Sequence, residues 1–354
     1  MTTTWRCLGR RVAGGVVAAW LALPAISGAE SGVQVEVREG ERRVDVRIGE
    51  EPFTSYIWPE RLAKPVLYPI RSARGSIVTR GFPLDPRPGE RVDHPHQVGL
   101  WLNYGDVNGV DFWNNSEALS PEERARMGTI RHREIVDARA GAERGSLEVG
   151  LDWLMPGGRK ALDERTRFVF RAVAGGRAID RLATLTAESD RVRFADNKEG
   201  MLGLRVARAL EQPSDEPAVF TNASGRATAV PVMGKGARGT YTSSEGRRGD
   251  AVWGTRARWV ALSGRVGEED VVLLVLDHPA NPGYPTYWHA RGYGLFAANP
   301  LGQKVFSDGK EELAFALEPK QSASFRHRLL VLSAPFAADT AEAAWKEFVE
   351  EYRP

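Results

Sequence analysis

Two distant segments of the chain are dense in side chains that can transfer protons, bind metals or contact sugars. The first contains His94 and His96, and the second contains His278 and His289, so together they hold four of the six histidines. Imidazole exchanges protons near neutral pH and is also a common metal ligand. If the fold brings the two segments together, they form one polar site.

His94 and His96 are two residues apart, within Asp93-His94-Pro95-His96. Residues i and i+2 of an extended strand share one face, so both rings can point into one cleft. The pair suits general acid–base catalysis, or ligation of a divalent metal with His278, His289 or a carboxylate as third ligand. The spacing does not choose between these roles and simple hydrogen bonding within a loop, so the cofactor is unknown.

Carboxylates near these segments supply the partner that a catalytic histidine needs. Asp106 precedes Asn108-Gly109, a strong turn signal, so a structural role in the turn is an equal alternative. Glu199 follows Lys198 in a charged interruption of a strand-like run, and a solvated turn is the alternative there. The predicted catalytic residues are His94, His96, Asp106, Glu199, His278 and His289.

Aromatic, amide and cationic side chains in or near the same segments suit a sugar. The indole face can stack on the C–H side of a sugar ring, and a guanidinium can clamp oxygen atoms. Core packing and structural ion pairs are the alternatives for these residue types. The predicted substrate-binding residues are Trp101, Asn108, Asp111, Lys198, Arg205, Trp253, Arg256, Trp288, Arg291 and Asn299.

The N-terminus has the pattern of an export signal. Arg10 and Arg11 precede a mostly apolar run over residues 12–26, and small residues end at Ala29. This pattern predicts a Sec-type signal peptide over residues 1–29, cleaved after Ala29. We therefore expect a periplasmic or secreted protein.

Cleavage changes the charge of the chain. The whole sequence has 48 basic and 46 acidic residues, and the signal removes three arginines, which leaves a net charge of −1. Cys7, the single cysteine, leaves with the signal. The mature protein is expected to have no disulfide, and a nucleic-acid partner lacks its electrostatic basis.

Short alternating apolar runs dominate the rest of the chain, with Gly, Pro, Asn and Asp between them. Residues 33–48 predict a β-hairpin that turns at Glu39-Gly40-Glu41. Further predicted strands are 146–154, 165–173, 178–187, 201–210, 259–262, 271–276, 311–317 and 324–332. The pattern predicts an all-β protein, a large antiparallel β-sandwich, with residues 30–354 as one domain.

Two helices are predicted from local signals. Ser120-Pro121-Glu122-Glu123 is a capping box that predicts a short helix near residues 121–127. Apolar residues at helical spacing predict a second helix over 340–352, started by Asp339 or Thr340 and docked on a sheet. No phosphate-binding glycine loop, Gly-x-Ser-x-Gly elbow or His-Glu-x-x-His motif is present.

The polar segments resemble those of a bacterial family known as the PmoA family, or methane oxygenase PmoA. The matching motifs are Asp93-His94-Pro95-His96, Gly105 through Trp113, Trp253-Gly254-Thr255-Arg256, Asp277-His278-Pro279, Tyr287 through Arg291, and Asn299-Pro300. The resemblance covers roughly residues 35–335. Members commonly carry a second histidine after the His-Pro-His run, where this chain has Gln97.

The resemblance implies a secreted protein of uncertain function, encoded beside sugar-degrading genes and built like the β-supersandwich of galactose-mutarotase-like proteins. The leading hypothesis is a carbohydrate-active hydrolase, lyase or epimerase that acts on a glycoside or oxidised sugar. The alternatives are a glycan-binding protein without catalysis and a mononuclear iron or copper oxygenase. The expected partner is a small-molecule or oligosaccharide substrate, with no membrane after cleavage and with the oligomeric state open.

Overall fold

A computed structural model describes residues 1–4, 32–214, 218–222, 224, 226–228 and 236–353. The predicted signal peptide falls almost wholly on residues 5–31, outside the described part. Among the described residues, no helix has both the length and the hydropathy that a bilayer span needs.

The first of two large sheets has eight antiparallel strands in the order β1-β2-β3-β4-β5-β11-β16-β15. Its strands are β1 (Val33–Arg38), β2 (Arg43–Ile48), β3 (Glu51–Ile57), β4 (Val66–Leu67), β5 (Leu100–Tyr104), β11 (Gly200–Arg205), β16 (Leu295–Asn299) and β15 (Tyr287–Ala290). The β1–β2 hairpin turns over residues 39–41, which confirms the predicted hairpin.

The second sheet also has eight antiparallel strands, in the order β12-β13-β14-β18-β9-β8-β7-β6. Its strands are β12 (Thr240–Ser243), β13 (Trp259–Val266), β14 (Glu269–Asp277), β18 (Ser322–Leu332), β9 (Gly176–Ala187), β8 (Lys160–Val173), β7 (Arg144–Leu154) and β6 (Thr129–Arg139). Two short strands, β10 (Val192–Arg193) and β17 (Ala316–Leu317), pair separately. The two sheets confirm the predicted antiparallel β-sandwich.

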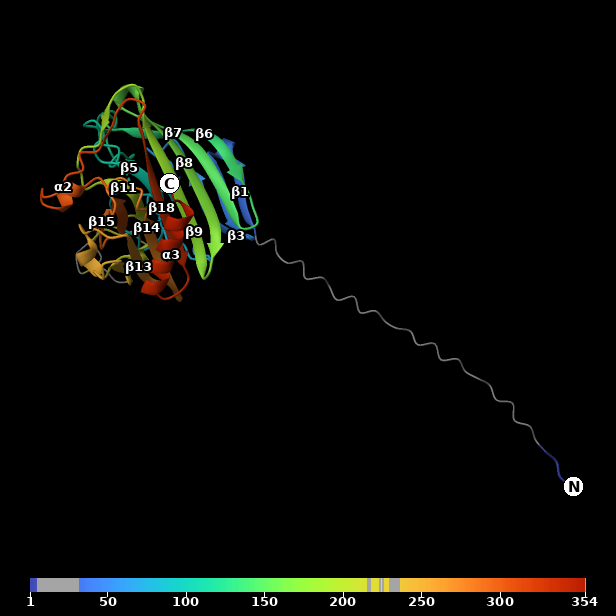
Figure 1. Ribbon diagram of the computed structural model, residues 1–354. Coiled ribbons are helices and arrows are strands. Elements are labelled where there is room, and N and C mark those ends of the chain that lie inside the picture. The colour runs from blue at the N-terminus through green and yellow to red at the C-terminus, as the bar shows by residue number, and fades with distance from the viewer. Residues whose placement is uncertain (5–31, 215–217, 223, 225, 229–235, 354) are drawn as a thin grey trace.

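The sheets stack face to face over one apolar core (Figure 1). Leu102 and Phe296 of the first sheet belong to that core with Phe170 and Leu273 of the second. Because alternate strand residues point to opposite faces, the neighbouring Trp101 belongs instead to a smaller cluster on the outer face of the first sheet. That outer face carries the candidate site.

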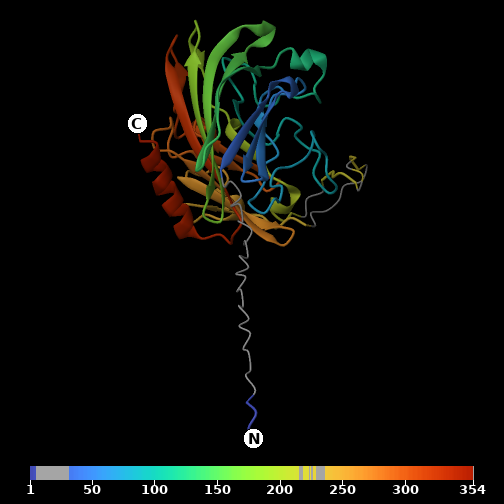
Figure 2. The ribbon, with the colours of Figure 1, turned by 90° about the vertical axis from the view of Figure 1, so that its right-hand side faces the viewer.

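The longest helix, α3 (Ala338–Glu351), covers the outer face of the second sheet, on the side away from the first sheet (Figure 2). Its Ala341 and Phe348 are buried there, so the predicted docked helix is confirmed. The predicted start was wrong, because Ala337 is the N-cap and no side chain caps the helix.

The remaining helical segments are short. In α1 (Pro121–Arg124) both hydrogen bonds of the capping box with Ser120 are present, which confirms that prediction, although the helix ends three residues early. The others are α2 (Gln303–Phe306) and the 3₁₀ turns η1 (Glu39–Glu41), η2 (Pro156–Gly158), η3 (Arg208–Leu210) and η4 (Gly249–Val252).

Two predicted strands are shorter than expected. The run 201–210 leaves the sheet after Arg205 and buries Leu210 through the turn η3 instead. The run 311–317 pairs only at its last two residues. Short apolar runs have similar patterns in strands and in buried turns, so periodicity could not separate them.

Candidate functional site

Four strands of the first sheet place one residue each in a row across its outer face. Trp101 of β5 pairs with Gly203 of β11, which pairs with Ala297 of β16, which pairs with His289 of β15. A Cβ atom on Gly203 would lie 2.3 Å from Cζ2 of Trp101. Only glycine therefore lets the indole ring lie across β11, and the row has small residues at its centre.

Two buried arginines hold the turn that carries the first histidine pair. Arg80 donates to Asp93 Oδ1 at 2.7 Å, and Arg205 donates to the same oxygen at 2.5 Å. Arg205 also donates to Gln97 Oε1 at 2.5 Å. Burial alone would raise the pKa of Asp93, but the nearby His94 and the two guanidinium charges outweigh it and hold that pKa below its ordinary value. Asp93 is therefore an ionised anchor for the turn.

His94 is presented at the surface of this turn. Its backbone adopts a φ of +44°, and its side chain is 41 % exposed. Nδ1 lies 3.3 Å from Asp93 Oδ2. The ring stacks on Tyr293, with centroids 4.9 Å apart and planes 3° from parallel. An accessible imidazole held by a carboxylate and an aromatic ring is suited to proton transfer.

His96 does not share the exposure of His94. Residues 94–97 form a turn, in which the Gln97 N–H donates to the His94 carbonyl at 3.0 Å, so the predicted extended conformation is wrong. The two rings meet edge to face, at 5.7 Å and 82°. Burial and the neighbouring Lys64 lower the pKa of His96 to about 2, so its ring is neutral. His96 lines a separate cavity on the far side of the turn.

His289, on β15, is oriented by the charged segment before β11. Its Nδ1 lies 2.8 Å from the Lys198 carbonyl oxygen. A carbonyl oxygen only accepts, so Nδ1 carries the hydrogen and Nε2 carries a lone pair. Burial lowers the pKa of His289 below its ordinary value. The ring is thus a neutral base, beside the Lys198–Glu199 ion pair.

Arg291, Trp253 and Tyr293 connect the two histidines. The guanidinium carbon of Arg291 lies 5.2 Å from the Trp253 ring and 5.8 Å from the Tyr293 ring. Trp253 is 42 % exposed, and its ring centroid lies 6.4 Å from that of His289. Among the described residues, Arg291 forms no ion pair. The two polar segments therefore meet through a continuous series of ring contacts.

A cavity of about 310 Å³ lies next to this group; Arg291, Trp253 and Tyr293 line it, whereas His94 and His289 do not. Its polar and aromatic lining residues are Arg91, Asp93, Gln212, Ser214, Asp250, Trp253, Arg291 and Tyr293. Sequence reasoning missed Tyr293 and Arg80. Tyr293 lies only two residues beyond Arg291, so a wider reading of that segment could have included it. Arg80 has no local signal, because its role is set by a distant carboxylate.

His278 is not part of this group, contrary to the prediction. It follows β14 and packs edge-on against Phe348 of α3, with ring centroids 5.4 Å apart. Its Nε2 lies 3.4 Å from the Val349 carbonyl oxygen. The helix covers the outer face of the second sheet, so the apolar core separates His278 from His289.

Asp106 and Asn108 stabilise turns rather than facing the cavity. Asp106 Oδ1 accepts from the Gly109 N–H at 2.8 Å, which is the structural alternative. Asn108 donates to the Arg191 carbonyl at 3.1 Å and accepts from the Arg193 N–H at 2.8 Å. The structure does not bring either residue to the two histidines.

Asp111 and Arg256 also have structural partners. Asp111 Oδ1 accepts from the backbone N–H groups of Trp113 and Asn114, at 2.7 and 3.0 Å. Arg256 donates to the Pro285 carbonyl and pairs with the Glu311 carboxylate at 2.7 Å. Neither lines the cavity of about 310 Å³.

Trp101, Trp288 and Asn299 are each 0 % exposed, so they cannot contact a sugar in this structure. Trp101 donates to Asn103 Oδ1 at 2.9 Å, and Trp288 packs in the main core. Asn299 donates to the Asn197 carbonyl at 2.7 Å, which ties β16 to the segment before β11. Of the predicted tryptophans, Trp253 is the exposed one.

The candidate metal ligands do not assemble. Within the described residues, no three His, Cys, Asp or Glu side chains form a group that could hold a metal ion. The His94 and His96 rings meet edge to face at 5.7 Å without a third ligand beside them among the described residues, and His278 packs against Phe348 of α3.

Similarity to solved structures is distant. The galactosidase domain of the alpha-galactosidase-sucrose kinase AgaSK matches with a TM-score of 0.38 and 9 % identity, over 85 % of this chain and 42 % of that chain. The present chain thus spans less than half of that one. The Slr1438 protein from Synechocystis sp. PCC 6803 matches with a TM-score of 0.33 and 10 % identity, over 85 % and 96 %. At this level the likeness carries no argument about activity.

No curated protein matches the sequence. A family model does, over residues 43–346, which is most of the chain. The chain belongs to the family described as "Family of unknown function (DUF6807)".

Proposed function

We propose that this protein is an exported carbohydrate-active enzyme that transfers a proton on a glycoside or an oxidised sugar. The observation that carries the proposal is the arrangement of His289. Its Nδ1–H donates a hydrogen bond to the Lys198 carbonyl oxygen, and its Nε2 has no hydrogen bond among the described residues. The exposed ring of Trp253 lies beside it.

The walls of the cavity suit a sugar. Trp253 offers an apolar face of the kind that packs on the C–H side of a pyranose ring. Gln212 and Asp250, which bond each other at 2.7 Å, add amide and carboxylate groups for hydroxyls. An aromatic platform with a few convergent polar groups is typical of a ligand site.

The proposed mechanism assigns one role to each group. His289 accepts a proton from the substrate at Nε2. Arg291 stabilises negative charge that develops on a substrate oxygen, because its guanidinium has no carboxylate partner among the described residues. His94, the more accessible imidazole, returns a proton or protonates a leaving group.

This arrangement favours a lyase or an epimerase over a hydrolase. Most glycosidases use two carboxylates, one on each side of the bond that is cleaved. Here Asp93 is bound by two arginines, and Glu199 is paired with Lys198. Asp250, the other carboxylate at the cavity, accepts a hydrogen bond from Gln212 at 2.7 Å, so the cavity offers no pair of unengaged carboxylates, whereas each of the two histidines keeps a ring nitrogen available.

Incubation of the mature protein in D₂O with uronates, keto sugars and methyl glycosides tests the proposal, with ¹H NMR as the readout. We expect loss of one substrate C–H signal, or a new product, with at least one of these sugars. His289→Gln should abolish the change. His278→Gln is the matched control, because it makes the same substitution beyond the core, and it should keep full activity.

If sugars bind near Trp253 but none is exchanged or converted, the protein is a glycan-binding protein and the enzymatic proposal is wrong.

Export of the protein and its relation to the PmoA family are also part of the proposal. Mass spectrometry of the protein recovered from the periplasm or medium should give a chain that begins at Glu30.

A further inference from the structure

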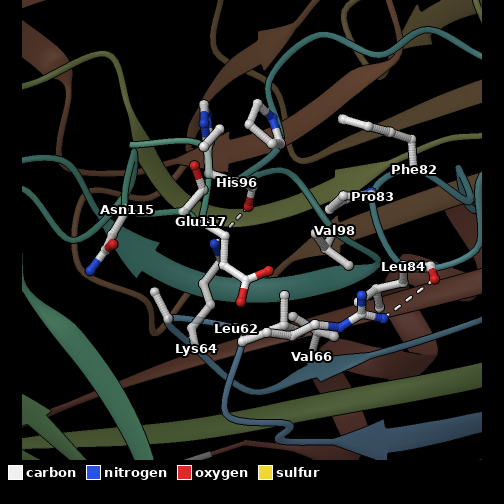
Figure 3. A pocket seen from close by; sticks show the side chains of 15 residues that line it. Leu62, Lys64, Val66, Phe82, Pro83, Leu84, His96, Val98, Asn115 and Glu117 are labelled. Atoms are coloured by element: carbon white, nitrogen blue, oxygen red, sulfur yellow. Dashed lines mark hydrogen bonds between the residues drawn. The ribbon is translucent and has the colours of Figure 1, made fainter. Parts of the chain in front are cut away.

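A second cavity, of about 230 Å³, lies over the outer face of the first sheet on the other side of the His94–Gln97 turn (Figure 3). Its apolar lining residues are Leu62, Ala63, Val66, Phe82, Pro83, Leu84, Pro95, Val98 and Ala118. Its polar groups are Arg61, Lys64, His96, Asn115, Ser116 and Glu117. The functional site described above does not use this cavity.

Lys64 extends into this cavity toward His96, as Figure 3 shows. The residue is 4 % exposed, and Nζ donates to the His96 carbonyl oxygen at 2.7 Å. Nζ also lies 5.3 Å from the centroid of the Trp101 ring. No described carboxylate forms an ion pair with it. A buried lysine without a carboxylate is rare, because the charged amine loses its hydration without compensation.

Two further buried polar atoms on the cavity walls have no hydrogen-bond partner in the described structure. They are His96 Nε2 and Asn115 Oδ1, and the residues are 9 % and 5 % exposed. The Asn115 amide cannot turn without loss, because Nδ2 donates to the Gly128 carbonyl at 2.8 Å. Buried polar atoms in native proteins are nearly always satisfied by protein, water or ligand.

We propose that this cavity binds a small carboxylate that carries hydroxyl groups, the class that includes uronic and aldonic acids. The ligand carboxylate pairs with Lys64, and its hydroxyls bond His96 Nε2 and Asn115 Oδ1. The apolar walls pack on its C–H groups. The volume is below that of a drug-sized site, so it suits a single sugar unit.

Two cations, Arg61 and Lys64, and one carboxylate, Glu117, line the cavity, so the net charge of its lining favours an anion over a neutral sugar. A ligand carboxylate supplies the counter-ion that the chain lacks beside Lys64, and a charge-assisted hydrogen bond is about twice as strong as a neutral one. Burial lowers the pKa of Lys64 to about 7, only partly opposed by Asp111. A bound carboxylate favours the protonated amine, so we expect tighter binding at pH 6 than at pH 8.

Isothermal titration of the mature protein with sodium D-glucuronate and sodium D-gluconate tests the proposal. D-glucose and acetate serve as comparison ligands, each of which lacks one half of the proposed chemistry. We expect at least one of the two acids to bind, at least tenfold more tightly than D-glucose and acetate. Lys64→Met should weaken that binding at least tenfold. Lys310→Met, the same change on the exposed surface, should leave it unchanged.

Two more variants locate the binding. Leu84→Trp fills the cavity from its partly exposed rim and should also weaken binding, while Lys64 is intact. Arg291→Gln changes the other cavity and should leave binding unchanged. Near-UV circular dichroism checks that each variant is folded. Any of three results would overturn the proposal. The first is no heat of binding with either acid, the second is the same affinity for Lys64→Met as for the wild type, and the third is a loss of binding only in Arg291→Gln.

This inference does not depend on the proposed enzymatic activity. Binding at Lys64 is measured without turnover, and His289→Gln should retain it. Proton exchange at His289 is measured by NMR, so one proposal can fail while the other stands.

Discussion

The imidazole ring of His94 lies parallel to the phenol ring of Tyr293, with centroids 4.9 Å apart. The Arg205 guanidinium carbon lies 4.9 Å from the same phenol ring, and that of Arg291 lies 5.8 Å from it. Tyr293 is thus shared by the turn that carries His94 and by the strand end that carries Arg291. Its ring makes one site of two segments that are far apart in the sequence.

His94→Phe should preserve the stacking on Tyr293 and remove the imidazole nitrogens that would transfer the proton. We expect turnover of the sugar found by NMR to fall by about 10²- to 10⁴-fold, the usual contribution of general acid–base catalysis. The melting temperature should stay close to that of the wild type, because an aromatic ring still covers Tyr293. Unchanged turnover would show that His94 does not transfer the proton.

Asp93→Asn should destabilise the fold. Arg80 and Arg205 would then face each other without a counter-ion, and breaking a buried ion pair costs about 3–5 kcal/mol. Because Asp93 is partly solvated, we expect about 2 kcal/mol by urea denaturation. The surface pair of Arg159 and Asp190 gives the matched control, and Asp190→Asn should cost less than about 1 kcal/mol.

The same pair predicts a pH dependence. The folded pKa of Asp93 is lower than the unfolded one, so its stabilisation is complete above the unfolded pKa and is lost as the pH falls through the folded pKa. The stability difference between wild type and Asp93→Asn should therefore shrink as the pH drops below about 4. If the stability difference between the two proteins does not change with pH, the stabilisation does not come from the ionised carboxylate of Asp93.

Lys64→Met should stabilise the protein at neutral pH and reduce the increase of its unfolding free energy at higher pH. Burial lowers the folded pKa of Lys64 to about 7, so between pH 7 and about 10 the unfolded chain binds more protons than the folded one. The unfolding free energy of the wild type should therefore increase with pH over this range because of Lys64. Urea titrations at pH 7 and pH 9.5 should show a smaller rise for Lys64→Met, and equal rises would show that Lys64 has an ordinary pKa.

Phe348→Ala should detach or loosen α3. Phe348 is fully buried against the second sheet, and truncation of a buried phenylalanine costs about 3–5 kcal/mol. Lys346→Ala, at an exposed position of the same helix, should change the unfolding free energy by less than about 0.5 kcal/mol. Both variants should retain binding at Lys64 when folded, because α3 packs on the outer face of the second sheet, whereas that cavity lies over the outer face of the first sheet.

The sequence by itself determined the local elements of this protein. Alternation of apolar residues identified the 33–48 hairpin and most strands of the second sheet. The capping box at Ser120 and the helical spacing before Tyr352 identified two helices. These signals lie within one element and follow the period of its backbone, 2 for a strand and 3.6 for a helix, so no distant contact is needed to read them.

Only the tertiary structure decided which polar residues meet. His278 and His289 are close in sequence, but β14 belongs to the second sheet and β15 to the first, so the core separates them. Lys64 and His96, by contrast, come together from segments that looked unrelated. A strand's period shows which of its residues share a face, but it does not show which sheet the strand joins. That is set by long-range pairing and packing, so the site could be predicted only in part.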